Sequence, residues 1–192
     1  MKSSNDSSVA TQLKSTWTKI YQDWFGREVD FTELTIPSFY DSAKHFAVIV
    51  AQCTAMNEVF TAMNNKFNLY SYTGNLDSSV ITNDRIADKD YVIIFNKNIK
   101  ADDNLKNLSA NKLIEMNISG ITLLERLLLE VLYFDNTSGH LDINDITLCS
   151  GSRDSGGNAP VVFWDDDSRL HVSWYYVDSC YDHLRSRAVV TQ

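Results

Sequence analysis

Apolar side chains recur at intervals of three and four residues along 9–25, which is the spacing of one face of an α-helix. This face holds Leu13, Trp17 and Ile20, and Gly26 directly after the segment suits a helix end. The preceding residues are polar. We therefore expect a polar tail over residues 1–8, followed by an amphipathic helix.

Three segments that differ in the spacing of their apolar residues follow. Residues 45–51, HFAVIVA, form a continuous apolar run rich in β-branched side chains, which predicts a buried strand. Residues 56–67 have helical spacing of their Met, Val and Phe side chains, and residues 68–73, NLYSYT, alternate like a strand. Together they predict a small β-α-β unit. Gly, Asn, Asp and Ser mark residues 74–88 as a loop.

The middle of the chain contains the clearest helix. Residues 90–99 read as a second strong strand, and Ser109 is a suitable N-cap for a short helix. Residues 122–134, TLLERLLLEVLYF, begin with Thr122 and have Glu125 three residues later, which is the pattern of a capping box. Leu and Val occur on nearly every side of this segment, so we expect a buried central helix.

After Gly139 the segments become short and β-like, and Gly and Asp clusters separate them. Two of them, 159–164 and 169–177, would form a hairpin joined by DDDS, with side chains pointing alternately to opposite sides. One side would be buried as the scaffold: Val162, Trp164, Leu170, Val172 and Trp174. The opposite side would be displayed: Val161, Phe163, His171, Ser173 and Tyr175. It continues into the loop YYVDSCYDH, residues 175–183, which is too polar and too aromatic for a mere linker.

Composition sets this C-terminal part apart. Residues 1–130 hold 10 Lys, 6 Glu, 3 Gln and 4 Met, whereas residues 131–191 hold none of the four. At the same rate (23 × 61/130), the second segment would hold about eleven of them. A deviation of this size calls for a cause.

Length and charge limit the class of protein. A chain of 192 residues with 44% hydrophobic content suits one domain, or one domain with a small companion. A net charge of −8 repels phosphate backbones, so we expect no nucleic-acid partner. The longest apolar run is too short to span a bilayer, and the N-terminus lacks the apolar region of an export signal. We therefore expect no membrane insertion, and a cytoplasmic or non-classically displayed protein.

Few residues suggest chemistry. The three cysteines, Cys53, Cys149 and Cys180, are too widely spaced for a disulfide framework or a zinc site. No phosphate-binding loop, zinc-protease motif or serine-hydrolase motif occurs. The run Asp165–Asp167 could ligate a hard cation, but consecutive side chains rarely converge on one ion, so a solvated hairpin tip is the simpler interpretation. We expect no metal, no cofactor and no enzymatic activity.

Tyrosines give the displayed region its character. Tyr175, Tyr176 and Tyr181 lie among Ser, Asp and His residues and near Phe163. Tyr supplies a large rigid contact area at a low entropic cost, and the polar neighbours add hydrogen bonds, which is typical of a binding surface. The alternative is that these tyrosines pack over a neighbouring loop.

Several motifs of the C-terminal part occur in an order that resembles a known family. These motifs are GITLLERLLLEVLYF, LCSGSR, Pro160-x-Val162-x-Trp164, Leu170-x-Val172-x-Trp174 and LRSRAVV. Over roughly residues 89–192 the chain resembles the variable proteins of diversity-generating retroelements. The resemblance implies a C-type-lectin-like fold and a gene whose 3′ end is rewritten by a reverse transcriptase that errs at adenines.

The resemblance also implies which residues can vary. Asn codons altered at their adenines reach many amino acids, but never Lys, Glu, Gln, Met or Trp, which would explain part of the compositional gap. A variable region of about 154–183 would then contain the ligand-binding positions. These are Asp154, Asn158, Val161, Phe163, Asp165, Asp166, Asp167, His171, Ser173, Tyr175, Tyr176, Asp178, Ser179, Tyr181, Asp182 and His183. Trp164 and Trp174 cannot arise in this way, and both fall on the side assigned to the core.

The sequence thus predicts an α+β protein in three parts. A polar tail (1–8) and an N-terminal α/β accessory segment (9–88) precede a C-type-lectin-like ligand-binding domain (89–192) of two helices and short antiparallel strands. We expect a diversified binding protein whose variable face contacts a protein ligand of unknown identity; the oligomeric state is left open. Two alternatives share the fold: a calcium-dependent sugar-binding lectin, and an enzyme of the formylglycine-generating type that would use Cys149 and Cys180.

Overall fold

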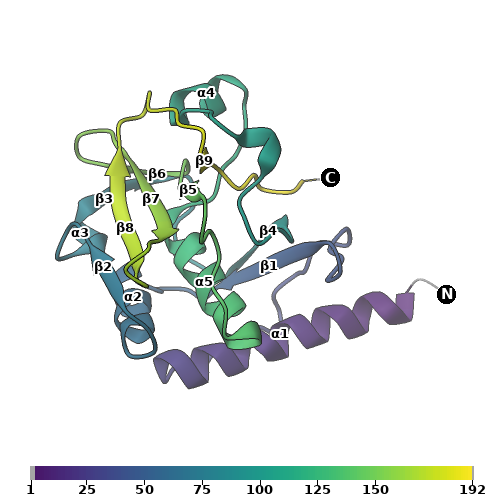
Figure 1. Cartoon of the computed structure of the whole chain (residues 1–192). Helices are drawn as coiled ribbons and strands as arrows, with labels where there is room; N and C mark the ends of the chain where they lie inside the picture. The colour runs from purple at the N-terminus through teal and green to yellow at the C-terminus, as the bar shows by residue number, and fades with distance from the viewer. Residues whose placement is uncertain (1–2, 192) are drawn as a thin grey trace.

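The computed structural model describes residues 3–191, and it shows an α+β protein with mixed sheets (Figure 1). Within these residues there are five α-helices and one short 3-10 helix. The helices are α1 (Ser3–Phe25), α2 (Met56–Asn64), α3 (Leu76–Ser79), α4 (Ala110–Glu115) and α5 (Leu123–Thr137), with the 3-10 helix at Asp103–Leu105. The strands are β1 (His45–Val50), β2 (Leu69–Ser71), β3 (Val80–Asn83), β4 (Tyr91–Asn96), β5 (Ile146–Leu148), β6 (Ser152–Asp154), β7 (Ala159–Trp164), β8 (Leu170–Tyr175) and β9 (Leu184–Arg185).

Helix α5 occupies the centre of the molecule, as its sequence predicts (Figure 1). The Thr122 side chain accepts a hydrogen bond from the Glu125 amide, and the Glu125 carboxylate accepts one from the Thr122 amide. This capping box satisfies donors that a buried helix end would otherwise leave unpaired. The next two turns are almost fully buried, including Leu127 and Val131. Helix α5 therefore forms the centre of the main core, and α2, β1 and β7 pack against it.

The predicted β-α-β unit over residues 45–73 is wrong, although its three elements exist. Strand β1 pairs antiparallel with β4 over six residue pairs, whereas β2 pairs in parallel with β8 in another sheet. The reason is that β1 is apolar on both faces, and β4 provides a partner of equal length and similar character. Strand β3 likewise pairs with β6. The strands of segment 9–88 thus complete their sheets with strands from 89–192.

Two further predictions for the N-terminal part need correction. Helix α1 already begins at Ser3, so residues 3–8 belong to the helix and do not form a tail, and residues 1–2 lie outside the described part. Extending a formed helix costs less than nucleating one, and Trp17 anchors it by donating its indole N–H to the Ala47 carbonyl at 2.9 Å. Residues 74–88 are not all loop, because α3 and β3 form there.

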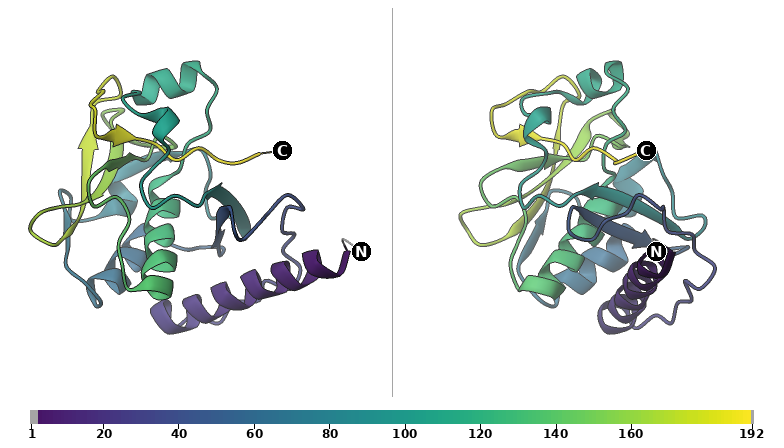
Figure 2. Two further views of the ribbon diagram at one scale, coloured as in Figure 1. Left: turned by 45° about the vertical axis from the view of Figure 1, so that its right-hand side comes forward. Right: turned by 90° about the vertical axis from the view of Figure 1, so that its right-hand side faces the viewer.

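Five strands in the order β2-β8-β7-β5-β9 form the largest sheet of the described residues. One side of this sheet packs on the main core around α5, and α1 runs along the bottom of the body (Figures 1 and 2). A second, smaller apolar cluster lies on the other side of the sheet, beneath α4; it comprises Leu105, Ala110, Leu113, Leu148, Ala159, Val161 and Leu184. Within residues 3–191, no helix has both the length and the apolar content needed to cross a bilayer.

Candidate binding face

Strands β7 and β8 form the expected hairpin, with Trp164 opposite Leu170 and Ala159 opposite Tyr175. Its turn is ordered by one carboxylate: Asp165 Oδ1 accepts the amides of Asp167 and Arg169, both at 3.1 Å. Such Asx contacts stabilise tight turns. The hairpin is therefore a fixed structure from which side chains point to two sides.

The side that the alternation assigns to the core does lie there. Val162, Leu170 and Val172 have no exposed surface, and Trp164 and Trp174 are half-buried against the main cluster. Trp164 also stacks on His140, with ring centroids 3.5 Å apart. These side chains connect the hairpin to α5.

On the opposite side, the prediction that Val161 is displayed is wrong. Val161 has no exposed surface because the segment carrying α4 folds over this part of the sheet and packs Leu105 and Leu113 against it. Phe163 and Tyr175 lie at the rim of the same cluster and are half-buried. The open part of this side is therefore narrower than expected and lies along β8 and the edge strand β2.

Strand β2 contributes aromatic residues that the sequence interpretation missed. Tyr70 is 43% exposed and lies beside His171, with ring centroids 5.0 Å apart. His171 in turn stacks on Phe163 at 5.2 Å, so three rings form a row across β2, β8 and β7. Tyr72 is 75% exposed and donates its amide to the Val172 carbonyl. The alternation in NLYSYT placed both tyrosines on one face, but the parallel pairing with β8 is a long-range contact that no local pattern reveals.

A second aromatic group lies where the chain leaves β8. Tyr175 and Tyr181 meet edge to face at 5.4 Å, and Tyr181 stacks on His183 at 5.6 Å. Partial burial raises the pKa of the Tyr175 phenol, which keeps it neutral. Tyr176 is 79% exposed. We use the name aromatic face for these two groups, the exposed Tyr72 and Tyr176, and Ser173, which lies between the groups on β8. Its residues are Tyr70, Tyr72, Phe163, His171, Ser173, Tyr175, Tyr176, Tyr181 and His183.

The loop after β8 is held in place from below. The Asn111 amide donates to the Val177 carbonyl at 3.1 Å, and the Asn111 side chain donates to the Asp178 carboxylate at 2.6 Å. The Ser179 amide closes a turn on the Tyr176 carbonyl at 2.8 Å. The loop therefore presents its side chains from a defined backbone.

The predicted acidic positions divide into two groups. Asp154 caps its own turn, since its carboxylate accepts the amides of Gly156 and Asn158, and Asp165 contacts His171 Nε2 in addition to the turn. Asp154 and Asp165 therefore help to hold the backbone. Ser173 and Ser179 are half-buried. The remaining predicted residues are exposed: Asp166, Asp167, Tyr176, Asp178, Tyr181, Asp182 and His183.

Metal and thiol chemistry find little support at these positions. Among the described residues, no three His, Cys, Asp or Glu side chains are grouped so that they could hold a metal ion. At the hairpin tip, Asp165 is engaged by His171 and Asp167 by Arg169. Cys149 is fully buried, and burial raises the pKa of its thiol, which disfavours the reactive thiolate. Cys180 is exposed on the loop.

A buried ionic network lies on the core side and was missed by the sequence interpretation. The Asp142 carboxylate lies 2.9 Å from the guanidinium group of Arg126 and 2.8 Å from that of Arg187. The Arg126 guanidinium also contacts the Glu130 carboxylate at 2.7 Å. Burial alone would raise the pKa of Asp142, but the two guanidinium groups hold it below its usual value. The Arg126–Glu130 spacing of four residues was visible inside the apolar helix. Its partners, Asp142 and Arg187, could not be identified from the sequence because they come from distant segments.

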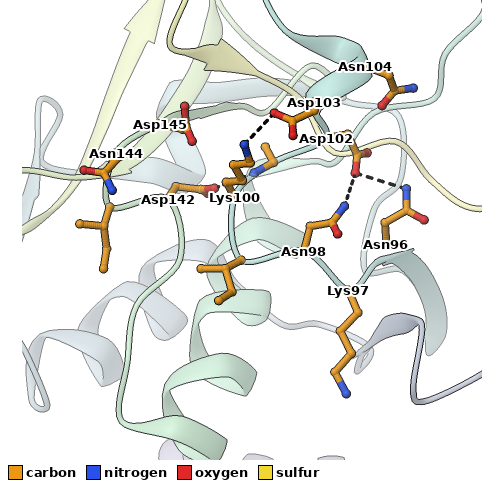
Figure 3. A pocket seen from close by; sticks show the side chains of 13 residues that line it. Asn96, Lys97, Asn98, Lys100, Asp102, Asp103, Asn104, Asp142, Asn144 and Asp145 are labelled. Atoms are coloured by element: carbon orange, nitrogen blue, oxygen red, sulfur yellow. Dashed lines mark hydrogen bonds and ion pairs between the residues drawn. The ribbon is translucent and has the colours of Figure 1, made fainter.

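A cavity of about 780 Å³ opens beside this network (Figure 3), and its lining contains none of the residues of the aromatic face. Its wall includes Asp102 and Asp103, but protein groups already engage both carboxylates. Asn96 and Asn98 donate to Asp102, and Lys100 contacts Asp103 at 2.9 Å, as the dashed lines in Figure 3 show. These contacts lie within loop 96–104. Arg185 also contacts Asp103 at 3.1 Å, and the Ala188 amide donates to Asp102 at 2.8 Å, so the two carboxylates hold the loop to the C-terminal segment.

A scan against protein-family models found no match for this chain, and neither did searches of curated proteins and of solved structures. No relative therefore supplies an activity or a ligand.

Proposed function

We propose that this protein binds a protein ligand through a surface whose residues can vary, and that it does so as a variable protein of a diversity-generating retroelement. The observation that carries the proposal is the two-sidedness of the β7–β8 hairpin. Val162, Leu170 and Val172 are buried, whereas the loop that continues from the same hairpin exposes Tyr176 and Tyr181. One short segment thus combines a fixed anchor with a surface open to a partner.

Energetics support this division. Exposed positions tolerate substitution within about 0.5 kcal/mol, whereas truncating a buried Leu or Ile costs about 2–5 kcal/mol. Changes at Asp166, Tyr176 or Asp182 would therefore leave the fold intact and alter the contact surface. Exposed tyrosines suit such a surface because they offer a large rigid area from few rotatable bonds.

Composition supports the same proposal. Every residue of 175–183 is among those that adenine-directed changes of Asn codons can produce. Trp164 and Trp174 are not, and both pack on the core side. A C-type-lectin-like arrangement of the 89–192 part belongs to this proposal as its finer fold assignment.

The proposal is tested with two matched display libraries. In the first, Asp166, Tyr176, Asp178, Tyr181 and Asp182 are randomised; in the second, buried residues Val162, Leu170 and Val172 are randomised with the same codons. We expect most members of the first library to remain folded and to yield binders to an arbitrary protein target, and most members of the second to unfold. Equal losses in both libraries, or a folded first library without binders, would contradict the proposal.

A genomic observation tests the retroelement assignment separately. The DNA beside the gene should contain a reverse transcriptase gene and a near-copy of the 3′ end that differs at adenines. Absence of both would remove the retroelement from the proposal and leave the display libraries to decide on binding alone.

A further inference from the structure

The aromatic face crosses the boundary between the two parts of the chain that the sequence predicts. Tyr70 and Tyr72 come from the N-terminal segment, and they extend the surface formed by His171 and Ser173 because β2 pairs with β8. Neither tyrosine lies in the expected variable region. A partner bound at this surface would therefore meet two fixed aromatic side chains as well as the variable ones.

Negative charge is concentrated around this face. Residues 154–183 contain six Asp and one Arg, which with neutral histidines gives −5 of the whole chain's −8. The other 162 residues therefore carry only −3. Four of the acids are exposed, Asp166, Asp167, Asp178 and Asp182, and of these Asp167 already contacts Arg169. Such a local excess of one sign attracts cations and repels nucleic acids, anionic lipids and the same face of a second copy.

The protein's own Arg169 shows how a cation lies on this surface. Its guanidinium carbon is 5.8 Å from the centre of the Tyr70 ring, and its Nη2 is 2.6 Å from the Asp167 carboxylate. An aromatic ring on one side and a carboxylate on the other is the arrangement that stabilises a guanidinium by cation–π and charge-assisted hydrogen bonding. Tyr176 is exposed two residues before exposed Asp178, and Tyr72 is exposed on the same edge strand as Tyr70, so both offer the same kinds of group to a cation from outside the chain.

We propose that the ligand of the aromatic face in this protein is a basic segment of a protein, whose Arg or Lys side chains lie on Tyr72 and Tyr176 and against Asp166, Asp178 and Asp182. This proposal rests on the proposed function and names the class of its partner. The tyrosines of β2 are a constant part of the contact, and the charge of the loop sets the preference for a cationic partner.

The test uses the isotope-labelled full chain and two short Gly-Ser peptides, one with several arginines and one with glutamates at the same positions. We expect the arginine peptide to shift amide NMR signals of β2, β8 and the loop 176–183, with an affinity that falls as salt rises. The glutamate peptide should shift none of them. No shifts with the arginine peptide, shifts outside this face, or equal shifts with both peptides would overturn the proposal.

Matched variants separate a local site from the attraction of the whole protein. We expect Asp166→Asn with Asp182→Asn to weaken arginine-peptide binding by about threefold to tenfold, and Tyr72→Ala by about twofold to fivefold. The control, Glu28→Gln with Asp88→Asn, removes two exposed acids outside the face and should change binding by less than about twofold. A control variant that weakens binding as much as the first would overturn the proposal, because net charge alone would then explain the attraction.

The two proposals fail in different ways. If the display library yields binders while the natural face ignores the arginine peptide, the basic partner is wrong and the proposed function stands. If the library unfolds or yields no binders, the proposed function itself fails. Unchanged signals of β1 and β4 in each variant show that the fold is intact.

Discussion

The two sides of the five-stranded sheet differ in whether their charged side chains are buried and paired or exposed to solvent. On the core side, the carboxylate of Asp142 is buried and held by two arginines, so each charge has a fixed partner. On the other side, Asp166 and Asp182 are exposed, and the neighbouring tyrosines reach into solvent. A buried charge requires its partners, whereas an exposed one leaves its residue open to change. The comparison teaches that charges fixed by partners belong to the fold, whereas the exposed charges leave their positions open to change.

The largest expected effect comes from breaking the ionic network. Asp142→Ala would leave the guanidinium groups of Arg126 and Arg187 buried without their shared carboxylate, which should lower the free energy of unfolding by about 3–5 kcal/mol. Urea unfolding measures this difference. The matched change at an exposed acid, Asp166→Ala, should stay within about 0.5 kcal/mol. Equal effects at both positions would abolish the contrast between the two sides.

A somewhat smaller effect is expected from the apolar anchor of the hairpin. Leu170→Ala removes a fully buried side chain from the core side of β8 and should cost about 2–4 kcal/mol. Ser173→Ala, on the other side of the same strand, is the control and should be nearly neutral. Thermal unfolding distinguishes them, and a Ser173 variant that melts as low as the Leu170 variant would contradict the assignment of sides.

Strong acid should weaken the ionic network on the core side. The pKa of Asp142 in the folded protein lies below its ordinary value of 3.8, so the unfolded chain binds more protons and stability rises with pH. The stabilisation from Asp142 is fully present above about pH 4 and is lost as the pH falls through the folded-state pKa. Asp142→Asn should be less stable at neutral pH but lose less stability on acidification. Parallel pH profiles of the two proteins would show that Asp142 does not contribute.

The smallest effects on stability are expected at exposed tyrosines. Tyr176→Ala should change the free energy of unfolding by less than about 0.5 kcal/mol, since the side chain is 79% exposed. Tyr175→Ala should cost more, because Tyr175 packs at the rim of the apolar cluster beneath α4 and against Tyr181. Both variants should weaken ligand binding. The order of their melting temperatures checks how far that cluster extends.

The local pattern of hydrophobic residues and caps was sufficient to predict some elements of the structure but not how distant segments pair. The capping box of α5, the hairpin and the buried side of β7 and β8 follow from periods and caps within a few residues of one another. The pairing of β1 with β4 and of β2 with β8 joins segments far apart in the sequence, and so do the coverage of Val161 and the contribution of Tyr70. These features depend on which segments meet, and no window of neighbouring residues contains that information.

The central claim is that the exposed positions of the β7–β8 hairpin and its loop can change without loss of the fold. It is tested most directly by the unfolding free energy of a single variant in which Asp166, Asp167, Tyr176, Asp178, Tyr181, Asp182 and His183 are all replaced by Ser. We predict a loss below about 2 kcal/mol for these seven exposed residues together, and a larger loss for the single change Val161→Ser beneath α4. A sevenfold variant that unfolds, or that loses more stability than Val161→Ser, would contradict the account.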